Sequence, residues 1–192
     1  MLEDLPIFIQ GERIHLAKPE VSFDFAKKMF AVVDVNREHI LPWLEWATFE
    51  RTKSAEDEFA FALDADNSWR DGSRFEFAIY SNDTKDYLGG ISLIKRGKTV
   101  CKCFEIGYWL RKDYCKKGYM QEAVMLLEKT AFNHDVERII IRNDTSNIAS
   151  KNVAIKCGYQ LEGVARHSQY NSVLQEFRDL NIFSKLKSEY KK

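Results

Sequence analysis

Several features that define other protein classes are scarce in this 192-residue sequence. The chain has 4 cysteines without metal-ligand spacing, so we expect free thiols in a reducing compartment. It has no apolar run near the roughly 20 residues that span a bilayer. Its first residues, Met1 to Asp4, lack the basic start of a signal peptide. These absences predict a cytoplasmic protein that does not contact a membrane.

Net charge is also missing, because 29 Lys and Arg residues balance 29 Asp and Glu residues. The chain therefore has no overall electrostatic footprint for nucleic acid or for an anionic membrane. What it does have is 45% hydrophobic and 13% aromatic residues, which is enough for a sizeable core. No linker or internal repeat divides the chain, so we predict a single domain over residues 1–192.

The most informative stretch runs from Phe104 to Ala123. It begins as an apolar, aromatic run, passes through a basic turn, and continues with apolar residues at helical spacing. The turn contains Lys116, Lys117 and Gly118. A helix start with unpaired N–H groups, two lysines and a glycine is suited to binding a phosphate. Neither a Walker loop nor a Gly-x-Gly-x-x-Gly motif is present, and the alternative is an ordinary helix start with solvated lysines.

The remaining pattern predicts strands and helices in mixed order. We expect strands at 11–16, 75–80, 87–94, 101–110, 138–142, 160–167 and 175–183, and amphipathic helices near 23–33, 54–63, 118–133 and 148–158. Residues 36–46, interrupted by Pro42, are predicted as a helical turn and a bend. Ser54 and Asp57 indicate a capping box, Gly107 a bulge or a close backbone approach, and residues 187–192 a frayed tail.

Three segments together resemble one known family. The run Glu105 to Leu110 followed by Cys115 to Ala123 resembles the cofactor motif Gln/Arg-x-x-Gly-x-Gly/Ala of the GCN5-related N-acetyltransferases. Residues 147–163 resemble the Asn-x-x-Ser...Lys-x-Gly-Phe...Glu-Gly segment of the RimJ/RimL branch, which acetylates ribosomal-protein N-termini. Residues 36–46 resemble the Asn-Arg...Trp-Leu-Pro-Trp segment of that branch.

The resemblance implies an α+β fold of the GNAT type. In that fold a central mixed, mostly antiparallel sheet is flanked by helices, and two central strands splay apart to admit the pantetheine arm of acetyl-CoA. Here the gap would lie between the strand ending at Leu110 and the strand at 139–142. No metal is implied. The residues that the resemblance places at the cofactor are Leu110, Cys115, Lys116, Lys117, Gly118, Tyr119, Met120, Asn147 and Ser150.

Two residues are predicted to take part in the chemistry. The resemblance places Ser150 near the cofactor sulfur, where it would protonate the thiolate, and Asn147 beside the pantetheine amides. The alternative is that Asn147 only caps a helix whose first turn contains Ser150. Glu105 lies in phase with Gly107 on the central strand and could accept the ammonium proton. Its alternative is a carboxylate paired with a nearby lysine.

Three positions depart from the family pattern. Cys115 replaces the usual Gln or Arg, and Met120 replaces Gly or Ala. Gln169 stands where ribosomal-type members can carry a glutamate proposed as the base. Tyr108, Tyr114 and Tyr119 could act as acids or simply pack.

We therefore predict an acetyl-CoA-dependent N-acetyltransferase acting on an α-amine, most of all a protein N-terminus. The alternatives are acetylation of a small amine, such as a polyamine, an amino acid or an aminoglycoside, and a non-catalytic acyl-CoA-binding module. The expected partners are the amine acceptor and, in a homodimer, a second copy of the chain. A monomer is the alternative, and no direct contact with nucleic acid is expected.

Overall fold

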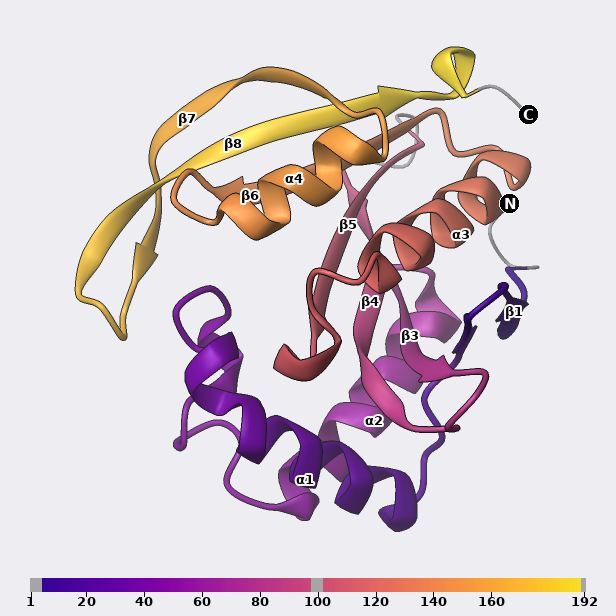
Figure 1. The fold of residues 1–192 in the computed structure, drawn as a ribbon, viewed down its shortest axis with the longest axis vertical. Coiled ribbons are helices and arrows are strands. Elements are labelled where there is room, and N and C mark those ends of the chain that lie inside the picture. Colours follow the sequence, from indigo (N-terminus) through magenta and orange to yellow (C-terminus); the bar gives the residue numbers. More distant parts are fainter. Residues whose placement is uncertain (1–4, 98–101, 191–192) are drawn as a thin grey trace.

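One mixed sheet organises the computed structural model, which describes residues 5–97 and 102–190 (Figure 1). Within these residues eight strands are arranged in the order β1-β2-β3-β4-β5-β6-β8-β7. Only the β5–β6 pair is parallel, and all others are antiparallel. The strands are β1 (Phe8–Gln10), β2 (Ile14–Ala17), β3 (Arg74–Ser81), β4 (Tyr87–Arg96), β5 (Cys103–Leu110), β6 (Arg138–Asp144), β7 (Gln160–Asn171) and β8 (Glu176–Leu186).

Helices cover both faces of this sheet, as expected for the GNAT type (Figure 1). The helices are α1 (Phe23–Ile40), α2 (Ala55–Asp71), α3 (Tyr119–Asn133) and α4 (Ile148–Lys156), with short 3-10 turns η2 (Glu45–Ala47), η3 (Lys112–Tyr114) and η4 (Lys187–Glu189). A large core joins α3 and α4 to one face of the sheet. A smaller one joins α1 and α2 to the other, through side chains such as Met29, Ala62 and Tyr87. The α+β prediction is confirmed.

Local sequence signals account for several element ends. Ser54 and Asp57 form the predicted capping box at the start of α2, with the Ser54 hydroxyl accepting the Glu56 amide at 3.2 Å. Gly158 follows α4 with a φ of +80°, a left-handed conformation that favours glycine. The predicted hairpin of β3 and β4 is also present, with a turn at residues 82–86.

Three local predictions were wrong. Helix α1 does not stop near Val33 but continues to Ile40, because Asn36 donates to the Val32 carbonyl and Arg37 reaches out to the loop beyond Pro42. The strand predicted at 11–16 is only β2 from Ile14 onward; residues 11–13 form the turn that joins it to the unpredicted β1. Of the expected frayed tail, residues 187–189 form η4 and Tyr190 packs on Phe132 with ring centroids 5.2 Å apart, while residues 191–192 lie outside the described residues.

Gly107 lies in a regular stretch of β5 with no bulge, since β4 and β5 stay in register from Gly89–Leu110 to Arg96–Cys103. A Cβ there would meet side chains only, at 3.7 Å, so the predicted backbone approach was wrong as well. The close approach is at Gly89, where a Cβ would lie 2.3 Å from the Trp109 carbonyl oxygen. The predicted start of this strand, Cys101, lies outside the described residues.

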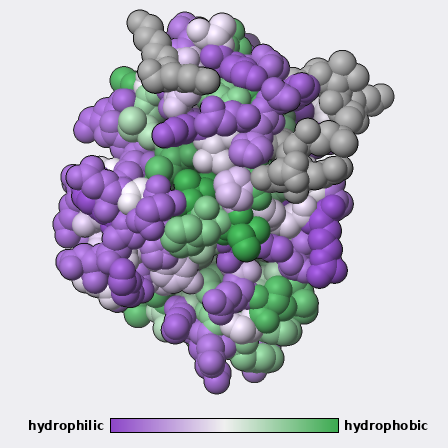
Figure 2. Space-filling view, turned by 90° about the vertical axis from the view of Figure 1, so that its right-hand side faces the viewer, coloured by the Kyte–Doolittle hydropathy of each residue, from purple (hydrophilic) through white to green (hydrophobic). Residues whose placement is uncertain are grey.

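The face that carries β1 and α3 shows an apolar patch at its centre and a second one at the lower right, set among hydrophilic side chains (Figure 2). Exposed apolar side chains at the β1 edge include Ile7 and Phe8. Among the described residues, no helix combines the length and apolar character that crossing a bilayer requires.

Candidate active site

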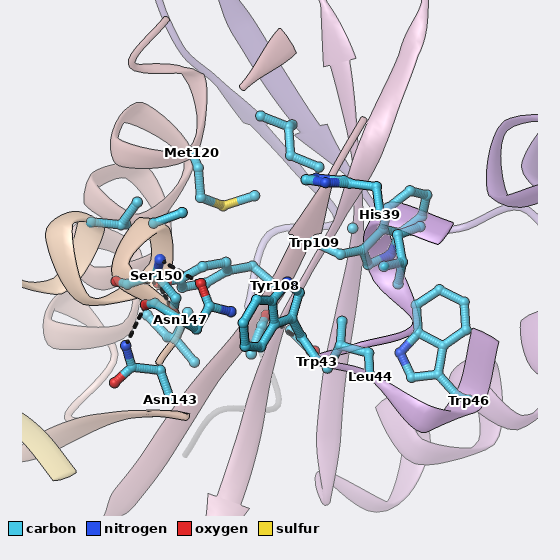
Figure 3. A pocket seen from close by; sticks show the side chains of 18 of the residues that line it. His39, Trp43, Leu44, Trp46, Tyr108, Trp109, Met120, Asn143, Asn147 and Ser150 are labelled. Carbon is cyan, nitrogen blue, oxygen red and sulfur yellow. Dashed lines mark hydrogen bonds between the residues drawn. The ribbon is translucent and has the colours of Figure 1, made fainter. Parts of the chain in front are cut away.

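A large cavity of about 1240 Å³ lies between the two halves of the sheet. Its walls come from the end of α1 and residues 41–54, the α2-facing side of β3, β4 and β5, the starts of α3 and α4, and the β7–β8 hairpin. Figure 3 shows Asn147 and Ser150 on one wall and Leu44 and Trp46 on the opposite one, with Tyr108 between them. Segments distant in sequence therefore meet around one space.

One end of the cavity is the turn that precedes α3. Gly118 has a φ of +84° and precedes a helix start with no side-chain cap. The first intrahelical bond at this end runs from the Glu122 amide to the Gly118 carbonyl, so the amides of residues 119–121 have no partner within the helix. This is the environment that binds an anion.

Arg13, which the sequence did not single out, supports this turn from the segment between β1 and β2. Its guanidinium pairs with Glu122 at 2.8 Å and donates to the Lys117 carbonyl at 2.9 Å. It also lies over the Tyr119 ring, 4.7 Å from the centroid. Arg13 therefore fixes the turn and adds positive charge beside Gly118.

The two predicted lysines have different surroundings. Lys116 lines the cavity, whereas Lys117 does not. The Lys117 ammonium lies over the Tyr114 ring, 5.4 Å from its centroid. Tyr114 also packs edge-on against Tyr119. Of the two, only Lys116 is placed to meet a ligand in the cavity.

The other predicted contacts of this turn line the cavity through largely apolar groups. Leu110 and Met120 are buried members of the core. The Cys115 thiol lies 3.3 Å from the Arg111 carbonyl oxygen and 3.5 Å from His39 Nε2. Burial raises the pKa of Cys115, and Asp113 adds to the effect. The Cys115 thiol therefore contacts the backbone of this turn as a neutral group.

The predicted splay lies between β5 and β6. Their parallel pairing consists of Cys103–Arg138, Phe104–Ile139 and Glu105–Ile140, and it stops there. Beyond this point β6 remains paired with β8 as far as Asp144. Residues 106–110 of β5 thus present one backbone edge without a partner strand, as a bound extended chain would require.

Asn147 and Ser150 meet at the start of α4, on the wall of this gap. The Asn147 side chain accepts the Ser150 amide at 3.0 Å, which is the capping role. The Ser150 hydroxyl is 2.9 Å from the Tyr108 hydroxyl, which also donates to the Ser150 carbonyl at 3.2 Å. Burial raises the pKa of Tyr108 above its ordinary value, so its hydroxyl stays protonated at any working pH. The two hydroxyls form a proton-donating pair.

Glu105 lines the cavity at the point where β5 and β6 separate. Its Oε2 accepts from Arg96 Nε and from Arg142 Nε, both at 2.8 Å. The expected lysine partner is thus replaced by two arginines. Both contacts are charge-assisted, and they hold one oxygen of this carboxylate in ion pairs with β4 and β6. Its role as a base stays a prediction.

The other end of the cavity is a chamber walled by aromatic rings. Trp46 packs edge-on against Trp109 with centroids 5.7 Å apart, and Trp109 packs against Tyr87 in the same way. The β7–β8 hairpin closes one side. Asn171 Nδ2 donates to the Pro42 carbonyl at 3.3 Å, and the Ser172 amide donates to Glu45 Oε1 at 2.6 Å.

Two further acids, Glu58 of α2 and Glu76 of β3, line this cavity. Glu58 is 3% exposed, and its Oε1 has no hydrogen-bond partner. Glu76 projects from β3 beside Arg74. Burial raises the pKa of each carboxyl to about 7, against the opposing charge of Arg37 for Glu58 and of Arg74 for Glu76.

Gln169 lines the same cavity. Among the described residues, no three His, Cys, Asp or Glu side chains are grouped so that they could hold a metal ion.

Comparisons with known proteins agree with this arrangement. Residues 13–160 match the family model described as an acetyltransferase (GNAT) domain. The chain is similar to the ribosomal-protein-serine acetyltransferase of Escherichia coli K12, with 23% identity over 167 residues that cover 86% of this chain and 89% of that protein.

Two solved structures share the fold. One is the ribosomal-protein-S5-alanine acetyltransferase from Vibrio fischeri, with a TM-score of 0.85 and 20% identity, covering 97% of this chain and 100% of that one. The other is the microcin C7 self-immunity acetyltransferase MccE, in complex with acetyl-CoA and AMP. Its TM-score is 0.83 and its identity 22%, covering 92% of this chain and 93% of that one.

Proposed function

Because the chain belongs to the GNAT acetyltransferase family, we propose that it transfers the acetyl group of acetyl-CoA to the α-amine of a protein N-terminus, in the manner of a ribosomal-protein acetyltransferase. The observation that carries this proposal is the continuity of the cavity. It runs from the basic turn before α3, along the unpaired edge of β5, to the aromatic chamber.

The residues along this path fit the parts of acetyl-CoA in order. The free amides after Gly118, with Lys116 nearby, would hold the pyrophosphate. The unpaired edge of β5 would hydrogen-bond the amides of the pantetheine arm, with Asn147 on the facing wall. The family's complexes, such as that of MccE with acetyl-CoA, support this assignment.

The chemistry needs a neutral amine, a polarised carbonyl and a proton for the departing thiolate. The amine nitrogen forms a bond to the thioester carbonyl carbon, the carbon–sulfur bond breaks, and the sulfur leaves as a thiolate. Ser150 would deliver a proton to it and recover one through the Tyr108 hydroxyl, 2.9 Å away. Backbone N–H groups on the free edge of β5 would polarise the carbonyl oxygen.

The pKa of the acceptor favours an α-amine. An α-amino group has a pKa near 8 and a lysine side chain one near 10.4, so deprotonation at pH 7 costs about 1.4 and 4.6 kcal/mol respectively. The first cost is within reach of a modest base. The relative in E. coli is named for a serine of a ribosomal protein, which supports a protein acceptor in the cytoplasm.

An acceptor panel tests the proposal through release of free CoA. A peptide with a free N-terminal serine or alanine should be acetylated faster than the same peptide N-blocked but carrying a lysine. It should also exceed spermidine, a free amino acid and an aminoglycoside. If the blocked peptide or a small amine is the better acceptor, the α-amine proposal is wrong. If CoA binds but no amine releases it, the chain is a binding module.

A further inference from the structure

A row of three residues crosses the sheet at the centre of the cavity. Glu76 on β3 is paired with Ser92 on β4, and Ser92 is paired with Gly107 on β5. All three line the cavity, so they share the face that the acceptor enters. Gly107 lies two residues beyond the last β5–β6 pair, at the start of the free edge. Having no Cβ, it leaves the acceptor side of this edge open.

The row brings the Glu76 carboxylate within reach of the reacting centre. Neighbouring strands lie about 4.8 Å apart, so the Cα atoms of Glu76 and Gly107 are separated by roughly 10 Å across the sheet. The glutamate side chain reaches across part of this span, over the small side chain of Ser92. The remaining space suits an amine nitrogen, or an amine and one water.

The groups around Glu76 leave its charge only partly balanced. From β3, Arg74 Nε lies 3.1 Å from Glu76 Oε1, but the same guanidinium also pairs with Asp64 of α2 at 2.5 Å. From β4, the Ser92 hydroxyl lowers the pKa of Glu76, and the nearby Tyr87 is neutral, since its own pKa is raised. Burial outweighs these contacts and raises the pKa of Glu76 to about 7.

The rival acid has the opposite environment. Glu105 shares one oxygen between two arginines that both donate at 2.8 Å. Both of these contacts are charge-assisted, whereas the guanidinium beside Glu76 is shared with Asp64. A base is most effective when its pKa lies close to the working pH.

On the basis of the proposed function, we propose that Glu76 is the general base, which takes a proton from the ammonium group of the acceptor, directly or through one water, before the amine attacks the thioester. The carboxylate becomes a carboxylic acid and the ammonium a neutral amine. The acid then returns its proton to solvent. The small gap between its pKa and that of an α-amine also explains why this site would accept an N-terminus more readily than lysine.

The first test compares Glu76→Gln with Glu105→Gln, using kcat/KM for a free-N-terminus peptide between pH 5.5 and 9.5. Glu76→Gln should lower the rate by about 100- to 10,000-fold near pH 6.5. Much of the loss should disappear near pH 9.5, where the free amine is abundant, and the Kd for CoA should not change. Glu105→Gln should lack this pH-dependent loss. The reverse pattern would make Glu105 the base and overturn the inference.

A second variant keeps the base and so guards against a folding defect. Because the Ser92 hydroxyl lowers the pKa of Glu76, Ser92→Ala should move the acidic limb of the pH profile to higher pH. An unmoved limb would count against Glu76. These tests distinguish the inference from the proposed function. If the wild-type protein acetylates no amine, the proposed function is wrong. If the wild type is active and Glu76→Gln is unaffected, only the assignment of Glu76 as the base is wrong.

Discussion

In the proposed mechanism, the hydrogen bond between Tyr108 and Ser150 is the route by which a proton would reach the departing sulfur. The two hydroxyls are 2.9 Å apart, and either can donate. Because burial raises the pKa of Tyr108 above its ordinary value, the hydroxyl holds its proton across the whole working range. The pair should therefore act as an acid at neutral and mildly basic pH alike, and neither hydroxyl should produce a basic limb in the pH profile below about pH 10.

Removing either hydroxyl should slow turnover more than it weakens cofactor binding. Ser150→Ala should lower kcat by roughly 10- to 1000-fold, and Tyr108→Phe should lower it by less, because water can replace the second donor. The Kd for CoA, measured by calorimetry, should stay within about 2-fold. A Ser150→Ala enzyme with weak CoA binding but normal kcat would show that Ser150 only holds the cofactor.

At this scale the sequence could identify residues within one motif but not partners across the sheet. Asn147 and Ser150 were found because they lie three residues apart in a recognisable segment. Arg13 and Glu76 were missed, since Arg13 meets Glu122 across 109 positions and Glu76 faces the cavity only through strand register. Such contacts depend on the folded topology, and no local pattern encodes them.

The basic turn between η3 and α3 gives a prediction at the scale of an element. Lys116 lines the cavity, whereas Lys117 lies over the Tyr114 ring. Charge-assisted contacts contribute about 1.5 to 3 kcal/mol, so Lys116→Ala should raise the Kd for CoA by about 10- to 150-fold. Its effect on kcat should be small, because the contact is present equally in ground and transition states.

Lys117→Ala is the matched control for this turn. It removes the same charge one residue away and should change the Kd by no more than about 3-fold at 0.15 M salt, where exposed charges are screened. Equal losses in the two variants would mean that the turn attracts CoA by general charge and not by a contact to Lys116.

Among the elements, strongly periodic segments were predicted well and irregular ones were not. Strands β3, β4 and β6 and helix α3 follow from apolar spacing. The end of α1 was misjudged because Pro42 suggested a turn and a bend over residues 36–46. In the structure Asn36 and Arg37 are instead buried and hydrogen-bonded along the helix and to the loop beyond it. Strand β1 has only three residues, too few for a period to show.

For the whole molecule, the buried acids predict how stability depends on pH. Glu58 has a pKa near 7 in the folded state and an ordinary value near 4.5 when unfolded. Between these values the folded chain binds more protons than the unfolded one, so the free energy of unfolding falls as pH rises. The destabilisation caused by burying the charged Glu58 carboxylate is absent below about pH 4.5 and complete above about pH 7.

Glu58→Gln should therefore stabilise the protein at pH 8 and not at pH 4.5. The gain at pH 8 is on the order of 3 kcal/mol at most, from a shift of about 2.5 pKa units, and denaturant unfolding at the two pH values measures it. Glu56→Gln is the control, since Glu56 is exposed two residues away in the same helix and its pKa is lowered. An equal gain in both variants would contradict the burial argument.

The sheet order β6-β8-β7 has a consequence for how the chain is made. The last strand in the sequence, β8, is not at the edge but is inserted between β6 and β7, and pairs with both. During synthesis β7 leaves the ribosome before its only partner strand exists. The aromatic chamber is closed by hydrogen bonds from Asn171 and Ser172 to residues 42 and 45. It can therefore form only after nearly the whole chain has been synthesised. In a nascent chain the turn proposed to bind the cofactor would therefore be complete well before the chamber could bind an acceptor. The proposed acetylation would begin only after the chain is released from the ribosome.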